Sequence, residues 1–212
     1  MLLIWDLDGT LVDSRADIVS AAQATLAELE QPPVSAAQVA SYVGDGIGKL
    51  IERLLPAGSA VERAQCQEIF ERHYAAGCCQ ATAAYPGIHA ALRDLTDAGW
   101  QHAVATNKAQ AYTAPILQHC GLAPYFAAVR SGDAQRKPDP WQLLDIVGEL
   151  GAEVTTTWMI GDHHTDILAA RAAGCRVLFC AWGMGHANGL PVDAMAMAPD
   201  EIAARLTRNP RR

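Results

Sequence analysis

Short apolar runs that end at polar residues recur along this chain of 212 residues. The first run, 1–5, has no polar alternation and stops at Asp6, which predicts a strand buried on both faces of a parallel sheet. Similar runs predict strands at 101–105, 127–130, 157–160 and 176–180. Helical patterns lie between these runs, at 87–98, 109–120, 139–150, 166–173 and 199–206. This alternation predicts an α/β fold with a doubly wound, Rossmann-like parallel sheet.

The segment 14–84 differs, because its apolar spacing is helical and predicts no strand. Helices are expected at 14–30, 35–43, 51–55 and 59–76, with Ser14 as the N-cap of the first. We therefore expect an α/β core made of 1–13 and 85–212, with 14–84 inserted after the first strand as an α-helical cap domain. An insertion at this point lies over the carboxyl edge of the sheet, where it can act as a lid.

Two carboxylates follow the first strand directly. Asp6 and Asp8 precede Gly9, which allows a sharp turn where the strand stops. Open α/β sheets bind their ligands at this edge. Two carboxylates close together repel each other, and a hard cation such as Mg²⁺ is the simplest way to stabilise them. Taken alone, the pattern also fits an ordinary acidic turn. The interpretation as a metal site therefore depends more on the residues at the later strand ends.

Three later segments place polar groups at strand ends. Thr106 and Asn107 follow the second predicted strand and can hold phosphoryl oxygens, although they also fit a helix N-cap. Lys137 lies between predicted elements, next to two prolines that define its local backbone. Asp162 and Asp166 follow a glycine turn and return two carboxylates to the same edge, which completes the acidic side of a Mg²⁺ site.

Composition narrows the class of protein. A net charge of −7 argues against nucleic acid or an anionic membrane as a partner, and no run approaches the roughly 20 apolar residues of a membrane span. The six cysteines lack metal-site spacing, which favours reduced thiols in a cytoplasmic protein. The only three lysines, Lys49, Lys108 and Lys137, each lie beside one of the segments that carry chemistry.

The order DxDGT, Thr, Lys-Pro and GDxxxD resembles the haloacid dehalogenase superfamily over nearly the whole chain, and the helical insert resembles its subfamily I with a small cap. The resemblance implies that Asp6 is the nucleophile and forms an aspartyl-phosphate, with Asp8 as general acid and base. It implies Mg²⁺ held by Asp6, the backbone carbonyl of Asp8 and Asp162, with support from Asp166. It also implies phosphate binding by Thr106, Asn107 and Lys137.

Within this superfamily the segments YVGDGIGKLIERLL, TNK, RKPDPWQLL and DILAARAAGC are most similar to bacterial phosphoglycolate phosphatases. The expected substrate is therefore a small anionic phosphate ester, 2-phosphoglycolate, handled by a monomer or homodimer. In such caps the glycine-rich loop faces the active site, so Gly44, Asp45, Gly46 and Lys49 are candidates for substrate selection. A cationic Lys49 suits a carboxylate-bearing substrate, although a solvated loop lysine is an equal alternative.

Other functions stay open at this point. A β-phosphoglucomutase-like phosphotransferase commonly has Glu-Asp where this chain has Gly161-Asp162, which argues against that function. The substrate can also be another sugar phosphate, N-acetylmuramic acid 6-phosphate or pyrophosphate. A non-catalytic binding protein would not need both Asp6 and Asp8, so the presence of both argues against that function. His163 departs from the small polar residue that is more usual after the fourth-motif Asp, and it is either a ligand for a softer metal or a hydrogen-bonding group of the turn.

Overall fold

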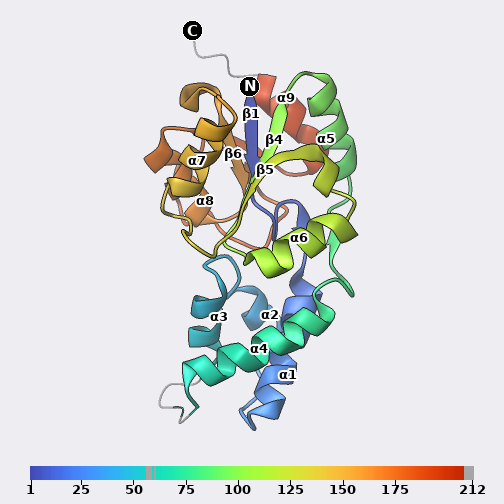
Figure 1. Ribbon diagram of the computed structural model, residues 1–212, viewed down its shortest axis with the longest axis vertical. Helices are drawn as coiled ribbons and strands as arrows, with labels where there is room; N and C mark the ends of the chain where they lie inside the picture. Colours follow the sequence, from blue (N-terminus) through green and yellow to red (C-terminus); the bar gives the residue numbers. More distant parts are fainter. Residues whose placement is uncertain (56–58, 60, 208–212) are drawn as a thin grey trace.

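The computed structural model describes residues 1–55, 59 and 61–207. Within these residues, six parallel strands are hydrogen-bonded in the order β5–β4–β1–β6–β7–β8 (Figure 1). The strands are β1 (Leu2–Trp5), β4 (Gln101–Ala105), β5 (Phe126–Arg130), β6 (Trp158–Gly161), β7 (Arg176–Cys180) and β8 (Ala194–Ala196). The predicted doubly wound α/β class is therefore confirmed.

Helices cover both faces of this sheet. They are α5 (Ile88–Asp97), α6 (Gln110–His119), α7 (Trp141–Glu149), α8 (His164–Ala173) and α9 (Ile202–Thr207). Short 3₁₀ helices at Ala123–Tyr125, Val154–Thr156 and Pro199–Glu201 precede β5, β6 and α9.

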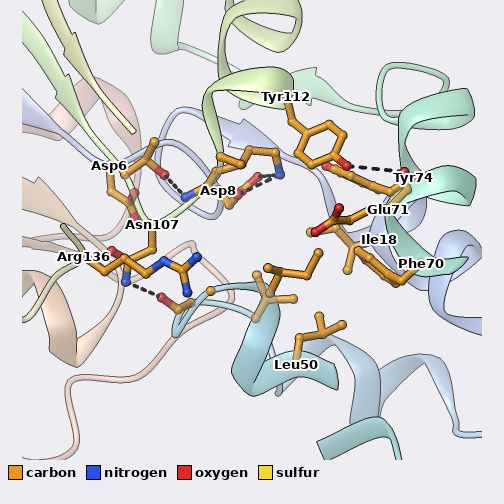
Figure 2. Close-up of a pocket in the computed structure, with 17 residues that line it drawn as sticks. Asp6, Asp8, Ile18, Leu50, Phe70, Glu71, Tyr74, Asn107, Tyr112 and Arg136 are labelled. Carbon is orange, nitrogen blue, oxygen red and sulfur yellow. Dashed lines mark hydrogen bonds and ion pairs between the residues drawn. The ribbon is translucent and has the colours of Figure 1, made fainter. Parts of the chain in front are cut away.

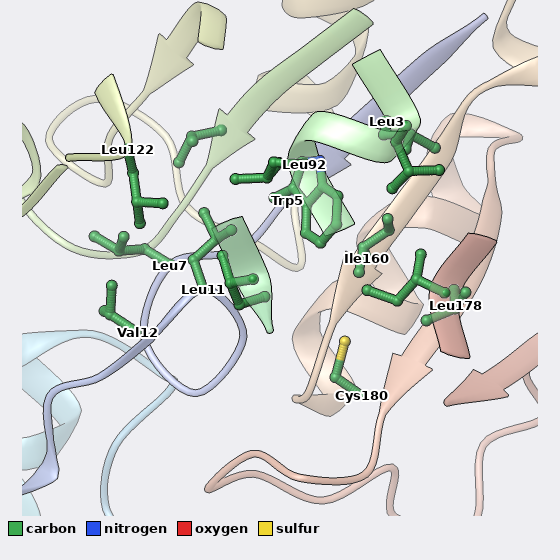
Figure 3. Close-up of a cluster of buried hydrophobic side chains, with 14 of the residues drawn as sticks. Leu3, Trp5, Leu7, Leu11, Val12, Leu92, Leu122, Ile160, Leu178 and Cys180 are labelled. Atoms are coloured by element: carbon green, nitrogen blue, oxygen red, sulfur yellow. The ribbon is translucent and has the colours of Figure 1, made fainter. Parts of the chain in front are cut away.

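Alternate side chains of β1 point to opposite faces of the sheet. Leu3 and Trp5 pack with side chains of α5 and α9 in one buried cluster, part of which is drawn in Figure 3. Leu2 and Ile4 pack on the other face with side chains of α7 and α8. All four side chains are completely buried, so the apolar run at the start of the chain reflects a strand covered on both faces.

The described part of the segment 14–84 contains a second group of helices, which lies below the sheet in Figure 1. These are α1 (Arg15–Glu28), α2 (Ala36–Ala40), α3 (Ile47–Leu54) and α4 (Arg63–Gly77). They share a buried cluster of their own, which includes Leu26, Leu50 and Phe70. The division into a core and a cap domain, with boundaries at 14 and 84, stays a prediction. None of the helices that the structure describes is long and apolar enough to cross a membrane.

Three short strands differ from the sequence prediction. β2 (Val12–Asp13) pairs antiparallel with β3 (Ala83–Ala84), so the two chain segments that link the sheet to the helices of 14–84 lie side by side. The prediction of no strand within 14–84 was therefore wrong, and β8 was missed as well. Strands of two or three residues are too short to show a period of two, so their pairing depends on tertiary contacts. α4 begins at Arg63 rather than at the predicted 59, and position 60 lies outside the described residues.

Candidate active site

Three strand ends meet at the carboxyl edge of the sheet, because β4, β1 and β6 are neighbours. Asp6 follows β1, Thr106 follows β4 and Asp162 follows β6. The pairing of β1 with β6 extends one residue further, since the Asp6 N–H donates to the carbonyl oxygen of Ile160 at 2.9 Å. The sheet topology thus brings together residues from three distant parts of the chain.

Asp6, Asp162 and Asp166 form a buried carboxylate cluster at this edge. One oxygen from each side chain lies within 4.8 Å of the other two. Thr10 Oγ1 donates to Asp162 Oδ1 at 3.0 Å, and two successive backbone N–H groups in the loop after β7 donate to Asp162 Oδ2 at 2.8 Å. Closely spaced carboxylates in fixed orientations are the donor set that a hard cation prefers.

The pKa values of the carboxylate cluster indicate that the nearby positive charge does not balance its three carboxylates. Burial, followed by the charges of Asp6 and Asp166, raises the pKa of Asp162 to about 7. Burial also raises the pKa of Asp6 to about 6, although Lys137 acts in the opposite direction. The surroundings therefore do not fully stabilise three ionised carboxylates. A divalent cation would supply the missing charge, so the residues present fit a metal ion.

Lys137 provides the ammonium group of the cluster, although the residue is only 3% exposed. Its Nζ lies 2.9 Å from Asp6 Oδ1 and 2.6 Å from Asp166 Oδ1. Burial alone lowers the pKa of Lys137, but the charges of Asp166 and Asp6 outweigh burial and raise the pKa above its ordinary value. Lys137 is therefore protonated and holds Asp6 in one orientation.

Asn107 supports Lys137 through two backbone hydrogen bonds. The Lys137 N–H donates to Asn107 Oδ1 at 2.7 Å, and Asn107 Nδ2 donates to the Lys137 carbonyl oxygen at 3.0 Å. The same Nδ2 also donates to the Gly44 carbonyl oxygen at 3.1 Å. Both amide hydrogens of Asn107 have acceptors within the chain, and the predicted role of this residue in phosphate binding stays a prediction. The hydrogen bonds of this side chain connect Lys137 to the glycine-rich loop.

Asp8, the predicted general acid and base, forms an ion pair that the sequence did not reveal. Lys108 Nζ lies 3.0 Å from both carboxylate oxygens of Asp8. Ser14 Oγ also donates to Asp8 Oδ1 at 2.5 Å, so Ser14 precedes α1 without capping it through its side chain. The Lys108 ammonium group lies 4.7 Å from the ring centre of Tyr74 in α4. Lys108 thus links the loop after β4 to Asp8 and to the helices of 14–84.

A cavity of about 90 Å³ lies between the sheet edge and the helices of 14–84. Asp6, Asp8 and Thr106 line the side that faces the sheet. The opposite wall is largely apolar and includes Leu50 and Phe70, as Figure 2 shows. This small volume suits a small ligand.

The glycine-rich loop contributes to this cavity only in part. Gly44 and Gly46 line it, and Asp45 instead forms an ion pair with Arg53 at 2.6 Å. Lys49 does not line the cavity, because its side chain is 58% exposed and its Nζ lies 3.2 Å from Glu52. The structure therefore does not place Lys49 where the sequence analysis expected it to select the substrate.

Two cationic residues at the cavity were absent from the predicted site. Lys108 has a signal in the sequence, namely its position beside a motif in a chain with three lysines. Arg136 has no such signal, because it is one of thirteen arginines. Its Nε donates to the Gly132 carbonyl oxygen at 2.7 Å, and its side chain lines the cavity (Figure 2).

Known proteins resemble this chain in sequence and in fold. Residues 3–180 match a family model described as haloacid dehalogenase-like hydrolase. A phosphoglycolate phosphatase of Neisseria meningitidis is 38% identical over 95% of this chain and 88% of its own length. Another, from Vibrio parahaemolyticus, is 36% identical over 97% of this chain and 92% of its own length. A crystal structure from Haemophilus somnus, described as a predicted phosphoglycolate phosphatase, superposes with a TM-score of 0.88 at 26% identity and covers 96% of each chain.

Proposed function

Because this chain belongs to the haloacid dehalogenase-like hydrolases and is a phosphatase, we propose that it hydrolyses 2-phosphoglycolate with Mg²⁺ as its metal and Asp6 as its nucleophile. The observation that carries this proposal is the position of Asp6. It shares the carboxylate cluster with Asp162 and Asp166, contacts Lys137, and lines a small cavity together with Asp8.

The carboxylate cluster supports the metal assignment. Carboxylate oxygens suit Mg²⁺, and the raised pKa values of Asp6 and Asp162 indicate that a positive charge is needed there. In this proposal Asp6, Asp162 and the backbone carbonyl of Asp8 hold the ion, and Asp166 supports them through Lys137. When bound, Mg²⁺ supplies Lewis-acid stabilisation of the negative charge on the phosphoryl oxygens.

Asp6 is oriented for nucleophilic attack by two donors on the same oxygen. The Leu7 N–H donates to Oδ1 at 2.8 Å, and Lys137 Nζ lies 2.9 Å from the same atom. Among the described residues, Oδ2 has no hydrogen-bond donor and is left for the reaction. Attack by this oxygen on phosphorus breaks the ester bond and leaves the phosphoryl group on Asp6.

Asp8 is the proposed general acid and general base. In the first step it gives a proton to the departing ester oxygen, and in the second it takes a proton from the water that attacks phosphorus. The second attack breaks the bond between phosphorus and Asp6 and releases inorganic phosphate. As a carboxylate paired with Lys108, Asp8 is set to accept a proton. Proton donation in the first step requires Asp8 to carry a proton before the ester bond breaks.

Thr106 and Lys137 are the proposed phosphoryl ligands. Thr106 Oγ1 accepts the Lys108 N–H at 3.2 Å, which leaves the hydroxyl hydrogen available to a phosphoryl oxygen. Thr106 is buried next to the cavity, so it can make this contact without competition from bulk water. The ammonium group of Lys137, 2.9 Å from Asp6 Oδ1, offers a fixed point charge beside the nucleophile.

Arg136 is the proposed ligand for the substrate carboxylate. Of the two cations that line the cavity in the described residues, Lys108 is already paired with Asp8. The bond from Arg136 Nε to Gly132 leaves both terminal nitrogens free of acceptors within the described chain. A guanidinium fork matches a carboxylate through two parallel hydrogen bonds. Together with the small cavity volume, this arrangement favours a short, carboxylate-bearing ester over a sugar phosphate.

Phosphate release with Mg²⁺ across a substrate panel tests the proposal. The panel contains 2-phosphoglycolate, glucose 1- and 6-phosphate, N-acetylmuramic acid 6-phosphate, pyrophosphate and nucleotides. We expect kcat/KM for 2-phosphoglycolate to exceed the others by about a hundredfold, which is about 2.7 kcal/mol of discrimination. A flat profile would remove the phosphoglycolate assignment and leave the phosphatase chemistry intact. Transfer of phosphate between sugar hydroxyls would instead favour the mutase alternative.

A further inference from the structure

A second group of metal-ligating side chains lies where the glycine-rich loop meets the core. Asp45, His163 and His164 each offer one ligand atom, and these atoms all lie within 4.8 Å of one another. Asp45 belongs to the loop between α2 and α3, whereas the two histidines lie at the start of α8. The proposed mechanism uses none of the three side chains.

The carboxylate of Asp45 is oriented through only one of its oxygens. Arg53 Nη2 donates to Asp45 Oδ2 at 2.6 Å, while Arg53 Nη1 donates to the Tyr42 carbonyl oxygen at 3.2 Å. The other oxygen, Oδ1, lies 3.9 Å from His164 Nε2. An outer partner that holds the non-ligating atom of a carboxylate is typical of metal sites.

The His163 ring is likewise held through only one of its two nitrogens. Its Nδ1 lies 2.9 Å from Thr165 Oγ1, so one ring nitrogen already has a partner on α8. The other nitrogen, Nε2, lies against the glycine-rich loop, because a Cβ atom added to Gly44 would come within 2.7 Å of it. The centres of the His163 and His164 rings are 4.1 Å apart. His163 Nε2 thus faces the loop that contains Asp45, and His164 Nε2 lies 3.9 Å from Asp45 Oδ1.

We propose that Asp45, His163 and His164 form a binding site for a transition-metal ion of the Zn²⁺ class. Two imidazole nitrogens and one carboxylate oxygen suit Zn²⁺, Co²⁺ or Ni²⁺ better than Mg²⁺, which prefers oxygen ligands alone. Water takes the remaining coordination position, as in other sites with three protein ligands. The site is chemically distinct from the carboxylate cluster, which contains no nitrogen ligand.

The position of the site predicts its effect on turnover. Gly44 and Gly46 flank Asp45 and line the cavity, so an ion bound to Asp45 and both histidines ties this loop to the core. A tethered loop slows substrate entry and product release. Zn²⁺ bound here is therefore inhibitory, even when Mg²⁺ is in excess.

Calorimetric titration of the full chain with Zn²⁺ tests the site directly. The background is Asp162→Asn, which weakens competition from the carboxylate cluster. We expect one bound ion, and we expect His164→Gln and Asp45→Asn each to lower the affinity at least tenfold. His119→Gln removes an exposed histidine at the end of α6 and is the matched control, with unchanged affinity. Circular dichroism checks that each variant is folded.

Cobalt absorption then separates this site from cysteine binding. Co²⁺ held by two imidazoles and a carboxylate gives visible d–d bands without a thiolate charge-transfer band, and His164→Gln should remove these bands. Zn²⁺ affinity that is equal in the parent, His164→Gln and Asp45→Asn proteins would overturn the proposal. The absence of binding at micromolar Zn²⁺ would do the same. Because these readouts are independent of turnover, they stand apart from the identity of the substrate.

Discussion

The contacts of individual lysines and arginines decide the chemistry at the cavity. Lys137, Lys108 and Lys49 are the only lysines of the chain, yet each meets a different partner. Lys137 contacts Asp6, Lys108 contacts Asp8, and Lys49 contacts the exposed Glu52. In the proposed mechanism two of the three lie where phosphate chemistry needs a point charge, and Arg136 has the substrate-binding role that the sequence suggested for Lys49.

Asp6→Asn should lower turnover by roughly 10³-fold or more, because an amide oxygen is a poor nucleophile toward phosphorus. The fold should persist, since the amide keeps the size of the carboxylate. Phosphate release measures turnover, and circular dichroism measures the fold. Asp97→Asn changes an exposed carboxylate at the end of α5 and is the control. Substantial activity in Asp6→Asn, with mass spectrometry showing no deamidation, would refute the nucleophile assignment.

Arg136→Gln should raise KM for 2-phosphoglycolate by roughly tenfold to a hundredfold with little change in kcat. A hydrogen bond to a charged group is worth about 1.5–3 kcal/mol, and this contact exists before and during the reaction. Ethyl phosphate lacks the carboxylate, so its KM should stay the same. Steady-state kinetics on both esters separates the two effects. If Lys49→Gln raises KM instead, the cap-loop lysine selects the substrate after all.

At the scale of elements, the end of β6 and the turn after β7 shape the proposed metal site. A Cβ atom at Gly161 would come within 2.2 Å of Asp166 Oδ2, and one at Gly183 within 2.3 Å of Asp162 Oδ2. Both distances are far below any normal contact, so only glycine lets these loops approach the carboxylates. This is also a physical reason why this chain cannot carry the Glu-Asp pair of the mutase alternative at 161–162 without moving Asp166.

Gly183→Ala should weaken Mg²⁺ binding by about tenfold to a hundredfold, because the added methyl group displaces the Asp162 carboxylate. Gly148→Ala is the matched control, since it lies in α7 and a Cβ atom there meets nothing within 4 Å. Calorimetric titration with Mg²⁺ measures both affinities. Equal Mg²⁺ affinity in the two variants would show that Asp162 does not hold the ion.

For the whole molecule, metal binding and folding are coupled through the buried carboxylates. The pKa of Asp162 is about 7 in the folded chain, against an ordinary value of 3.8. Between these values the folded state binds more protons than the unfolded state, so the free energy of unfolding without metal falls as pH rises from about 4 to about 7. If Mg²⁺ binds as proposed, it must displace these protons, so its affinity should increase over the same range.

The rise in melting temperature caused by a fixed excess of Mg²⁺ should therefore be larger at pH 8 than at pH 5.5. Ligand binding stabilises the folded state in proportion to the logarithm of concentration over Kd, so a tighter Kd gives a larger shift. Thermal melts with and without Mg²⁺ at both pH values measure the difference. Asp162→Asn should remove most of the pH dependence. An equal shift at both pH values in the parent protein would contradict the assignment of Asp162.

Short elements mark the limit of prediction from the sequence. β1, β4, β6 and β7 were predicted nearly to the residue, because strands buried on both faces leave continuous apolar runs. β2, β3 and β8 were missed, because two or three residues carry no period and pair only when the sheet or the crossing segments bring them together. The contacts of Asn107 with Lys137 and Gly44 were also missed, because they join residues far apart in the chain.

The sequence by itself determined the fold class and the order of the motifs at the strand ends. It did so because burial on both faces and turn geometry are local properties that residue types record directly. Only the tertiary structure decided which cation meets which carboxylate. Lys108 reaches Asp8 because β4 and β1 are neighbours in the sheet, whereas Arg136 lines the cavity and Lys49 is exposed. Such distances arise between segments far apart in the chain, and no local pattern encodes them.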